Sequence, residues 1–305
     1  MFDLQEAAAL LRSCRLCPRS CGVDRLAGER GVCGCGATVR VARAALHFWE
    51  EPCLSGEHGS GAVFFSGCSL HCCFCQNHQI STGLAGCDIT TERLCDIFSE
   101  LEAAGAENIN LVTAGHYLPL VVFALQQARA KGMRLPVVYN SGGYERVETL
   151  RLLEGLVDIY LPDLKFHRAA LSSRYAAAPD YFRVAAAAIA EMVRQVGKPQ
   201  FDARGMLRRG VIVRHLALPG QGEDSRRILR YLAQRYDDAV YLSLMSQYTP
   251  LPHAAAYPEL QRRLTAEEYS GLVDYAAELG IVNAYIQGEG AADAEFIPPF
   301  DNRGV

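Results

Sequence analysis

From residue 61 onward, short runs of β-branched and aromatic residues alternate with longer stretches that have the apolar spacing of amphipathic helices. Leu94, Ile97 and Phe98 show this spacing, and Thr265 with Glu268 forms a capping box before the last helix. Such alternation predicts βα units built on a parallel sheet, and therefore an α/β fold. Six strands are clear and a seventh is weaker: residues 62–66, 109–113, 136–140, 158–161, 211–216 and 240–244, with 282–286 as the seventh.

A cysteine-dense loop follows the first of these strands. Cys68, Cys72 and Cys75 stand in a C-x3-C-x2-C spacing. Electron-carrying clusters have cysteine at all four irons, so a loop with three thiolates predicts an iron–sulfur cluster whose fourth iron takes a small molecule. The alternatives are a zinc knuckle or buried free thiols. Cys73 lies between the predicted ligands and is expected to pack.

This loop, with the aromatic Phe74 before its last cysteine, resembles that of the radical S-adenosylmethionine (SAM) enzymes. The resemblance implies a partial (βα)6 TIM-like barrel and a 4Fe-4S cluster at Cys68, Cys72 and Cys75. It also implies that SAM binds the open iron and that the backbone at Phe74 lies against the adenine. Ligands of parallel barrels bind at the carboxyl ends of the strands, so the motifs at those ends are the candidates for cofactor binding.

The chain also begins with a cysteine group. Its spacing of C-x2-C-x3-C-x11-C is compatible with structural zinc or a second cluster, and the alternative is reduced thiols. Alternation over residues 39–49 predicts a strand or hairpin at the edge of the barrel. We therefore expect a Cys-rich N-terminal extension (1–60), a barrel (61–290) and a C-terminal tail (291–305). Residues 296–305 of this tail are expected to cover the barrel mouth or to contact a partner. The cysteines of the second candidate site are Cys14, Cys17, Cys21 and Cys33.

Two strand ends carry candidate SAM contacts. Many radical SAM enzymes have a Gly-Gly-Glu stretch after the second strand, but this chain has Thr113, Gly115 and His116 there and no acid. Backbone carbonyls and a neutral His116 are the expected substitutes for that carboxylate; the alternative is that His116 is a loop histidine bonded only to backbone. After the third strand, Asn140 and Ser141 precede two glycines, which allow a ligand to approach the backbone closely.

The fourth and fifth strands end in charged residues. Asp163 and Lys165 are two positions apart and therefore share one face of a strand. The stretch resembles the Asp-x-Lys of glycyl-radical-enzyme activases, which implies that Lys165 meets the SAM carboxylate and that Asp163 helps to hold a monovalent cation. Arg214 has the geometry to bind the carboxylate or the ribose, and His215 would then face the other way. Together these motifs resemble the pyruvate formate-lyase activating enzyme-like branch.

Composition limits the function classes. A net charge of −4 gives no excess of positive charge for nucleic acid, and no apolar run has the ~20 residues that span a bilayer. The start lacks a signal peptide, so a cytoplasmic protein is expected. The resemblance implies an oxidoreductase that cleaves SAM with an electron from flavodoxin or ferredoxin. Its substrate would be a glycyl-radical enzyme, another peptide or a small molecule; the alternative is a non-catalytic iron–sulfur carrier or sensor. The sequence identifies no general acid or base.

Overall fold

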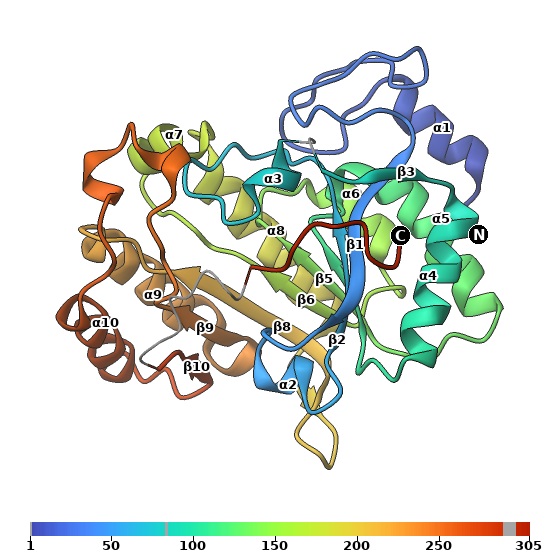
Figure 1. Cartoon of the computed structure of the whole chain (residues 1–305). Coiled ribbons are helices and arrows are strands. Elements are labelled where there is room, and N and C mark those ends of the chain that lie inside the picture. Colours follow the sequence, from blue (N-terminus) through green and yellow to red (C-terminus); the bar gives the residue numbers. More distant parts are fainter. Residues whose placement is uncertain (1, 83–84, 289–296) are drawn as a thin grey trace.

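A parallel sheet forms the centre of the computed structural model, which describes residues 2–82, 85–288 and 297–305 (Figure 1). The seven parallel strands stand in the sheet in chain order. They confirm the six predicted strands and the weaker seventh, each with bounds shifted by a few residues at most. The strands are β2 (Ser60–Phe65), β4 (Ile109–Val112), β5 (Val137–Ser141), β6 (Ile159–Pro162), β8 (Leu207–Leu216), β9 (Tyr241–Met245) and β10 (Ala284–Ile286).

Amphipathic helices pack on the outer side of this sheet (Figure 1). In α4 (Thr91–Ala103) the predicted apolar positions Leu94, Ile97 and Phe98 are buried, and Thr90 caps the first turn by accepting a hydrogen bond from Arg93 N. The predicted capping box also starts the last helix. The other long helices are α5 (Leu118–Ala130), α8 (Tyr181–Val196), α9 (Gly222–Tyr236) and α10 (Ala266–Glu278).

Short helices connect the strands to these elements. Most of them lie between a strand and the helix that follows it, as loops of parallel barrels commonly do. They are α3 (His78–Ser81), α6 (Val147–Leu150), α7 (Ala169–Ala176) and the 3-10 turns η1 (Gly115–Tyr117), η2 (Arg151–Leu153), η3 (Asp237–Ala239), η4 (Pro252–Ala254) and η5 (Pro258–Leu260).

The N-terminal part of the chain extends the sheet. After α1 (Leu4–Arg12), strand β1 (Val39–His47) pairs antiparallel with both β2 and β3 (Cys87–Ile89), which confirms the predicted edge strand. The short helix α2 (Pro52–Ser55) follows. Its Cys53 and Leu54 are buried against side chains of β5, β6 and β8. A two-residue strand, β7 (Gln200–Phe201), pairs with β8.

The C-terminal residues 297–305 run beside β1. Ala44 N donates a hydrogen bond to Arg303 O at 2.8 Å, and Asn302 N donates to Ala42 O at 2.9 Å. An ion pair of 2.7 Å joins Arg43 to Asp301. The predicted boundary at residue 290 and the first part of the predicted tail, 291–296, lie outside the described residues. Within the described ranges, the helices are too short or too polar to cross a bilayer.

Candidate active site

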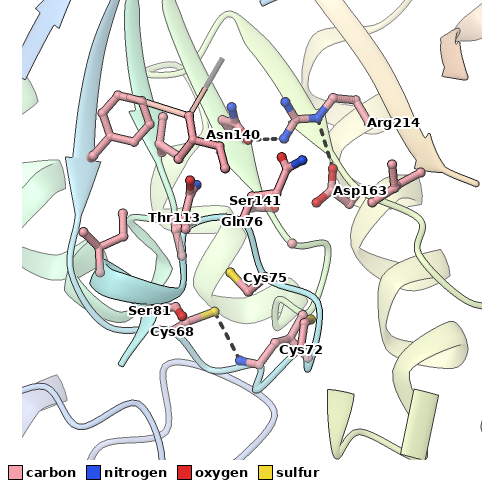
Figure 2. Close-up of a pocket in the computed structure, with 18 of the residues that line it drawn as sticks. Cys68, Cys72, Cys75, Gln76, Ser81, Thr113, Asn140, Ser141, Asp163 and Arg214 are labelled. Atoms are coloured by element: carbon pink, nitrogen blue, oxygen red, sulfur yellow. Dashed lines mark hydrogen bonds and ion pairs between the residues drawn. The ribbon is translucent and has the colours of Figure 1, made fainter. Parts of the chain in front are cut away.

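A cavity of about 240 Å³ lies at the carboxyl ends of the parallel strands (Figure 2). One wall is the cysteine loop after β2, and the facing wall comes from the ends of β4, β5, β6 and β8. The cavity therefore occupies the position at which parallel barrels bind their ligands. Its walls include these sequence-predicted residues: Cys68, Cys72, Phe74, Cys75, Thr113, Asn140, Ser141, Asp163, Lys165 and Arg214.

The three cysteines share one wall of this cavity, whereas Cys73 is outside the lining. Burial raises the pKa of each of the three thiols above its ordinary value, to about 12 for Cys72. Metal binding to such thiols would release their protons. Thiolates are the ligands of iron–sulfur clusters, so this donor set fits a cluster.

The loop turns sharply at Gly67, whose φ is +90°. A Cβ there would lie 2.1 Å from Cys35 Sγ, so only glycine fits this close approach. On the other side, Cys73 N donates a hydrogen bond to Tyr175 O at 2.8 Å. The loop is thus fixed at its start and near its middle.

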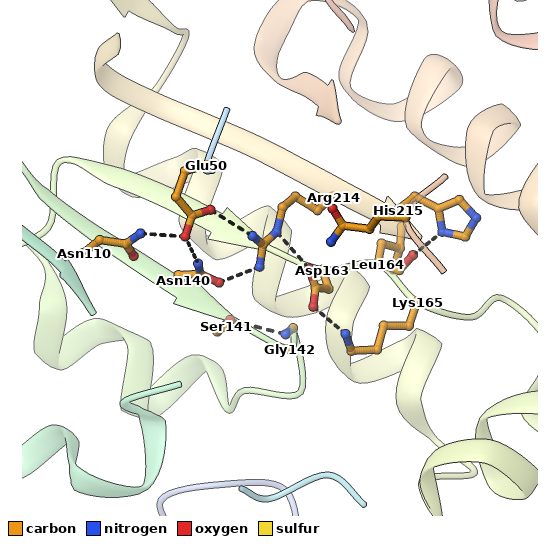
Figure 3. A network of polar contacts seen from close by, with 12 residues as sticks. Glu50, Asn110, Asn140, Ser141, Gly142, Asp163, Leu164, Lys165, Arg214 and His215 are labelled. Carbon is orange, nitrogen blue, oxygen red and sulfur yellow. Dashed lines mark hydrogen bonds and ion pairs between the residues drawn. The ribbon is translucent and has the colours of Figure 1, made fainter. Parts of the chain in front are cut away.

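Four charged side chains form a chain of alternating sign across the facing wall (Figure 3). The Lys165 ammonium contacts Asp163 Oδ2, and Arg214 Nε donates to Asp163 Oδ1 at 3.0 Å. Arg214 also donates to Glu50 Oε2 at 3.2 Å. Burial alone would raise the pKa of Asp163, but Lys165 and Arg214 lower it below its usual range. Asp163 therefore stays ionised.

Glu50 is a wall residue that the sequence analysis missed. It follows β1 and is buried in the interior of the barrel, with 8% of its side chain exposed. Besides Arg214, it accepts hydrogen bonds from Asn110 Nδ2 at 3.0 Å and Asn140 Nδ2 at 3.2 Å. These partners lie 60 to 164 residues away along the chain. No local pattern around Glu50 signals contacts over such separations.

Thr113 adopts a strained conformation on the cavity wall. Its φ is +61°, which is rare for a β-branched residue. Its N donates to Asn140 O at 2.8 Å, which holds it beside the end of β5. Strained backbone of this kind is typical of ligand sites.

Phe74 is buried and packs edge-on against Phe166 and Tyr248. The ring belongs to the apolar core, and the residue also lines the cavity. Sequence analysis also missed Gln76 and Gln247 on this wall, which are joined by a hydrogen bond of 3.2 Å from Gln76 Nε2 to Gln247 O.

Gly115 and His116 are not among the residues that line the cavity. The buried His116 ring has its Nε2 2.8 Å from Ser66 O, and burial lowers its pKa. The ring is thus engaged behind the cysteine loop, and the structure does not bring it to the predicted SAM site. His215 is also buried outside the cavity, with Nδ1 2.8 Å from Leu164 O, so it points away from Arg214 as strand alternation predicts.

The N-terminal cysteines have unlike surroundings. Cys14 is buried in a small apolar cluster and lies 3.9 Å from Arg25 Nη1, whereas Cys21 is exposed and accepts a hydrogen bond from Val32 N. Cys17 lines a small internal cavity with Glu145. All twelve cysteines are free thiols. Across the part of the chain that the structure describes, no three His, Cys, Asp or Glu side chains converge on a single-ion site. The second metal stays a prediction.

Comparisons with known proteins place the chain in a family. No protein-family model matches it. It is 30% identical over 292 residues to the uncharacterized protein MJ0674 of Methanocaldococcus jannaschii, a match that covers 92% of this chain and 80% of that protein. A radical SAM methyltransferase from Sphaerobacter thermophilus has a TM-score of 0.51 at 17% identity, over 76% of this chain and 67% of that one.

Two further solved structures are less similar. One is a domain of pyruvate-formate lyase-activating enzyme from Bacteroides vulgatus ATCC 8482, with a TM-score of 0.42, 12% identity and coverage of 56% of this chain and 92% of that one. The other is Streptococcus suis SuiB bound to precursor peptide SuiA, with a TM-score of 0.49, 11% identity and coverage of 75% and 48%. At 17% identity, the likeness to the methyltransferase is evidence for a shared fold alone. The chain has the radical SAM fold that its sequence predicts, and it belongs to the same family as MJ0674.

Proposed function

We propose that this protein is a radical SAM enzyme. The observation that carries the proposal is the shared cavity: three thiols from one loop face Asp163, Lys165 and Arg214 across it, at the ligand-binding end of a radical SAM fold. Cys68, Cys72 and Cys75 would hold a 4Fe-4S cluster. Bound there, the cluster would supply the electron for cleavage of SAM to methionine and the 5′-deoxyadenosyl radical, which abstracts hydrogen from the substrate.

The facing wall would bind and orient SAM. Lys165 offers an ammonium to the SAM carboxylate, and the backbone at Phe74 offers a surface to the adenine. Asp163 holds both Lys165 and Arg214 in place through charge-assisted hydrogen bonds. The electron donor that we propose is flavodoxin or ferredoxin.

A glycyl-radical enzyme is the substrate that the sequence motifs favour. The support is the Tyr-Leu-Pro-Asp-Leu-Lys stretch that includes Asp163 and Lys165, which resembles activating enzymes. Mixing the reduced protein and SAM with a candidate partner should then produce a glycyl-radical signal by electron paramagnetic resonance. If none of the candidate partners gives a glycyl-radical signal although SAM is cleaved, the substrate is another peptide or a small molecule.

The experiment that tests the enzyme proposal is anaerobic reconstitution with iron and sulfide, followed by dithionite and SAM. Mass spectrometry should detect 5′-deoxyadenosine and methionine in equal amounts. A reconstituted protein that binds a cluster and leaves SAM intact would instead be an iron–sulfur carrier or sensor.

A further inference from the structure

The N-terminal extension holds the cysteine loop from the outside, chiefly through Arg19. Arg19 Nε donates a hydrogen bond of 2.9 Å to the carbonyl of Ser69, which lies between Cys68 and Cys72. Its Nη1 donates 2.6 Å to the carbonyl of Ala177. One planar guanidinium thus bridges the cysteine loop and the end of α7, a geometry that a single ammonium cannot reproduce.

The surroundings of Arg19 keep this bridge in place. The carbonyls of Ala176 and Ala177 end α7, where the helix dipole favours a positive charge. The guanidinium also lies 5.2 Å from the centre of the Tyr144 ring, in cation–π geometry. Tyr144 is itself fixed by a hydrogen bond of 2.7 Å to Asp180.

Two smaller contacts join the same pair of segments. The His71 ring nitrogen lies 3.1 Å from Val32 O, and the Cys35 thiol lies 3.5 Å from Ser66 O. Of these three contacts with the cysteine loop, the one made by Arg19 brings a full positive charge to the loop. The extension therefore contributes both a mechanical support and an electrostatic one.

We propose that Arg19 is a positioning residue for the cluster, an inference that rests on the proposed function. The two hydrogen bonds of its guanidinium fix the backbone between Cys68 and Cys72, so the positions of those two thiols are set before iron binds. The charge of Arg19 lies at the carbonyl of Ser69, next to Cys68 in the chain, and a cluster held by Cys68 would gain an electron when it is reduced. Because a positive charge stabilises the more negative state, Arg19 raises the reduction potential.

The two roles separate in three full-length variants. Arg19→Gln removes both the bridging guanidinium and its charge, whereas Arg19→Lys keeps only the charge. The control, Arg15→Gln, removes an exposed charge four residues earlier in the same extension. In metal-free protein, anaerobic alkylation by iodoacetamide should modify Cys68 and Cys72 about tenfold faster in both Arg19 variants, as expected for loss of a charge-assisted hydrogen bond. Arg15→Gln should match the wild type.

In reconstituted protein, the effect of the Arg19 charge is measured as the reduction potential of the cluster, by a redox titration monitored by electron paramagnetic resonance. Arg19→Gln should shift the cluster to a more negative potential, while Arg19→Lys and Arg15→Gln stay at the wild-type value. Wild-type alkylation rates in both Arg19 variants, or equal potential shifts in Arg19→Lys and Arg19→Gln, would overturn the proposal. If the wild-type protein binds no cluster, the proposed function is refuted. The alkylation rates are measured in metal-free protein, so they still test whether Arg19 supports the cysteine loop.

Discussion

Arg214 of β8 and Asp163, which follows β6, are neighbours both in the sheet and through their side chains. Their main chains form a parallel bridge, and Arg214 Nε donates to Asp163 Oδ1 at 3.0 Å. The same guanidinium reaches Glu50 and Asn140, with Asn140 Oδ1 2.6 Å from Nη2. One arginine, with 17% of its side chain exposed, therefore connects two carboxylates that line the cavity.

Loss of Arg214 should destabilise the protein strongly. Arg214→Ala leaves Asp163 and Glu50 largely buried, and removing one partner of a buried ion pair costs about 3–5 kcal/mol. Urea unfolding monitored by circular dichroism measures this change. Arg227→Ala is the control, because its ion pair with Glu223 is exposed and is expected to contribute less than about 0.5 kcal/mol. Equal losses in the two variants would contradict the buried network.

Lys165 should contribute to SAM affinity. Lys165→Ala is expected to weaken SAM binding to the reconstituted protein by about 1–3 kcal/mol, the usual loss for a charge-assisted hydrogen bond. Isothermal titration calorimetry measures the affinity, and Lys131→Ala, on the exposed surface, serves as the control. If the affinity for SAM is unchanged in Lys165→Ala, Lys165 does not bind SAM and its ion pair with Asp163 has only a structural role.

His47 should make the fold sensitive to acid. Burial, and then the charges of Arg43 and Arg214, lower the pKa of His47 to about 4, against about 6.5 in an unfolded chain. Between these values the unfolded chain binds a proton that the folded chain does not, so stability present above pH 6.5 is lost as the pH falls toward 4. In urea unfolding at pH 7 and pH 5, His47→Gln should lose less stability than the wild type. The exposed His58→Gln should behave as the wild type, and an unaltered pH dependence in His47→Gln would refute the assignment.

The N-terminal cysteines should bind a metal that supports local folding. Replacing Cys14 and Cys17 with serine should lower metal content or stability, while the Cys68 cluster still binds SAM. Elemental analysis identifies the metal: about one zinc beside four irons indicates a structural site, and about eight irons indicate a second cluster. Four irons without zinc, and no effect of the double substitution, would leave these residues as reduced thiols.

The strands and ten of the residues that line the cavity were predictable because their signals are local. Runs such as residues 109–113 and the spacing of Cys68, Cys72 and Cys75 are complete within a few residues. Strand ends of a parallel sheet then meet by topology, which brought Asp163 and Arg214 together. Glu50 could not be found in this way, since its partners come from three strands distant in sequence. The sequence left two roles open for His116, and in the structure its ring turns behind the loop, toward Ser66 O.

The most direct test of the central claim compares two changes in one loop. The triple variant Cys68→Ala, Cys72→Ala and Cys75→Ala removes the thiols that line the cavity, whereas Cys73→Ala removes a thiol outside that lining. Each protein is reconstituted anaerobically, reduced with dithionite and incubated with SAM. The account predicts 5′-deoxyadenosine from the wild type and from Cys73→Ala, and none from the triple variant. Production of 5′-deoxyadenosine by the triple variant would contradict it.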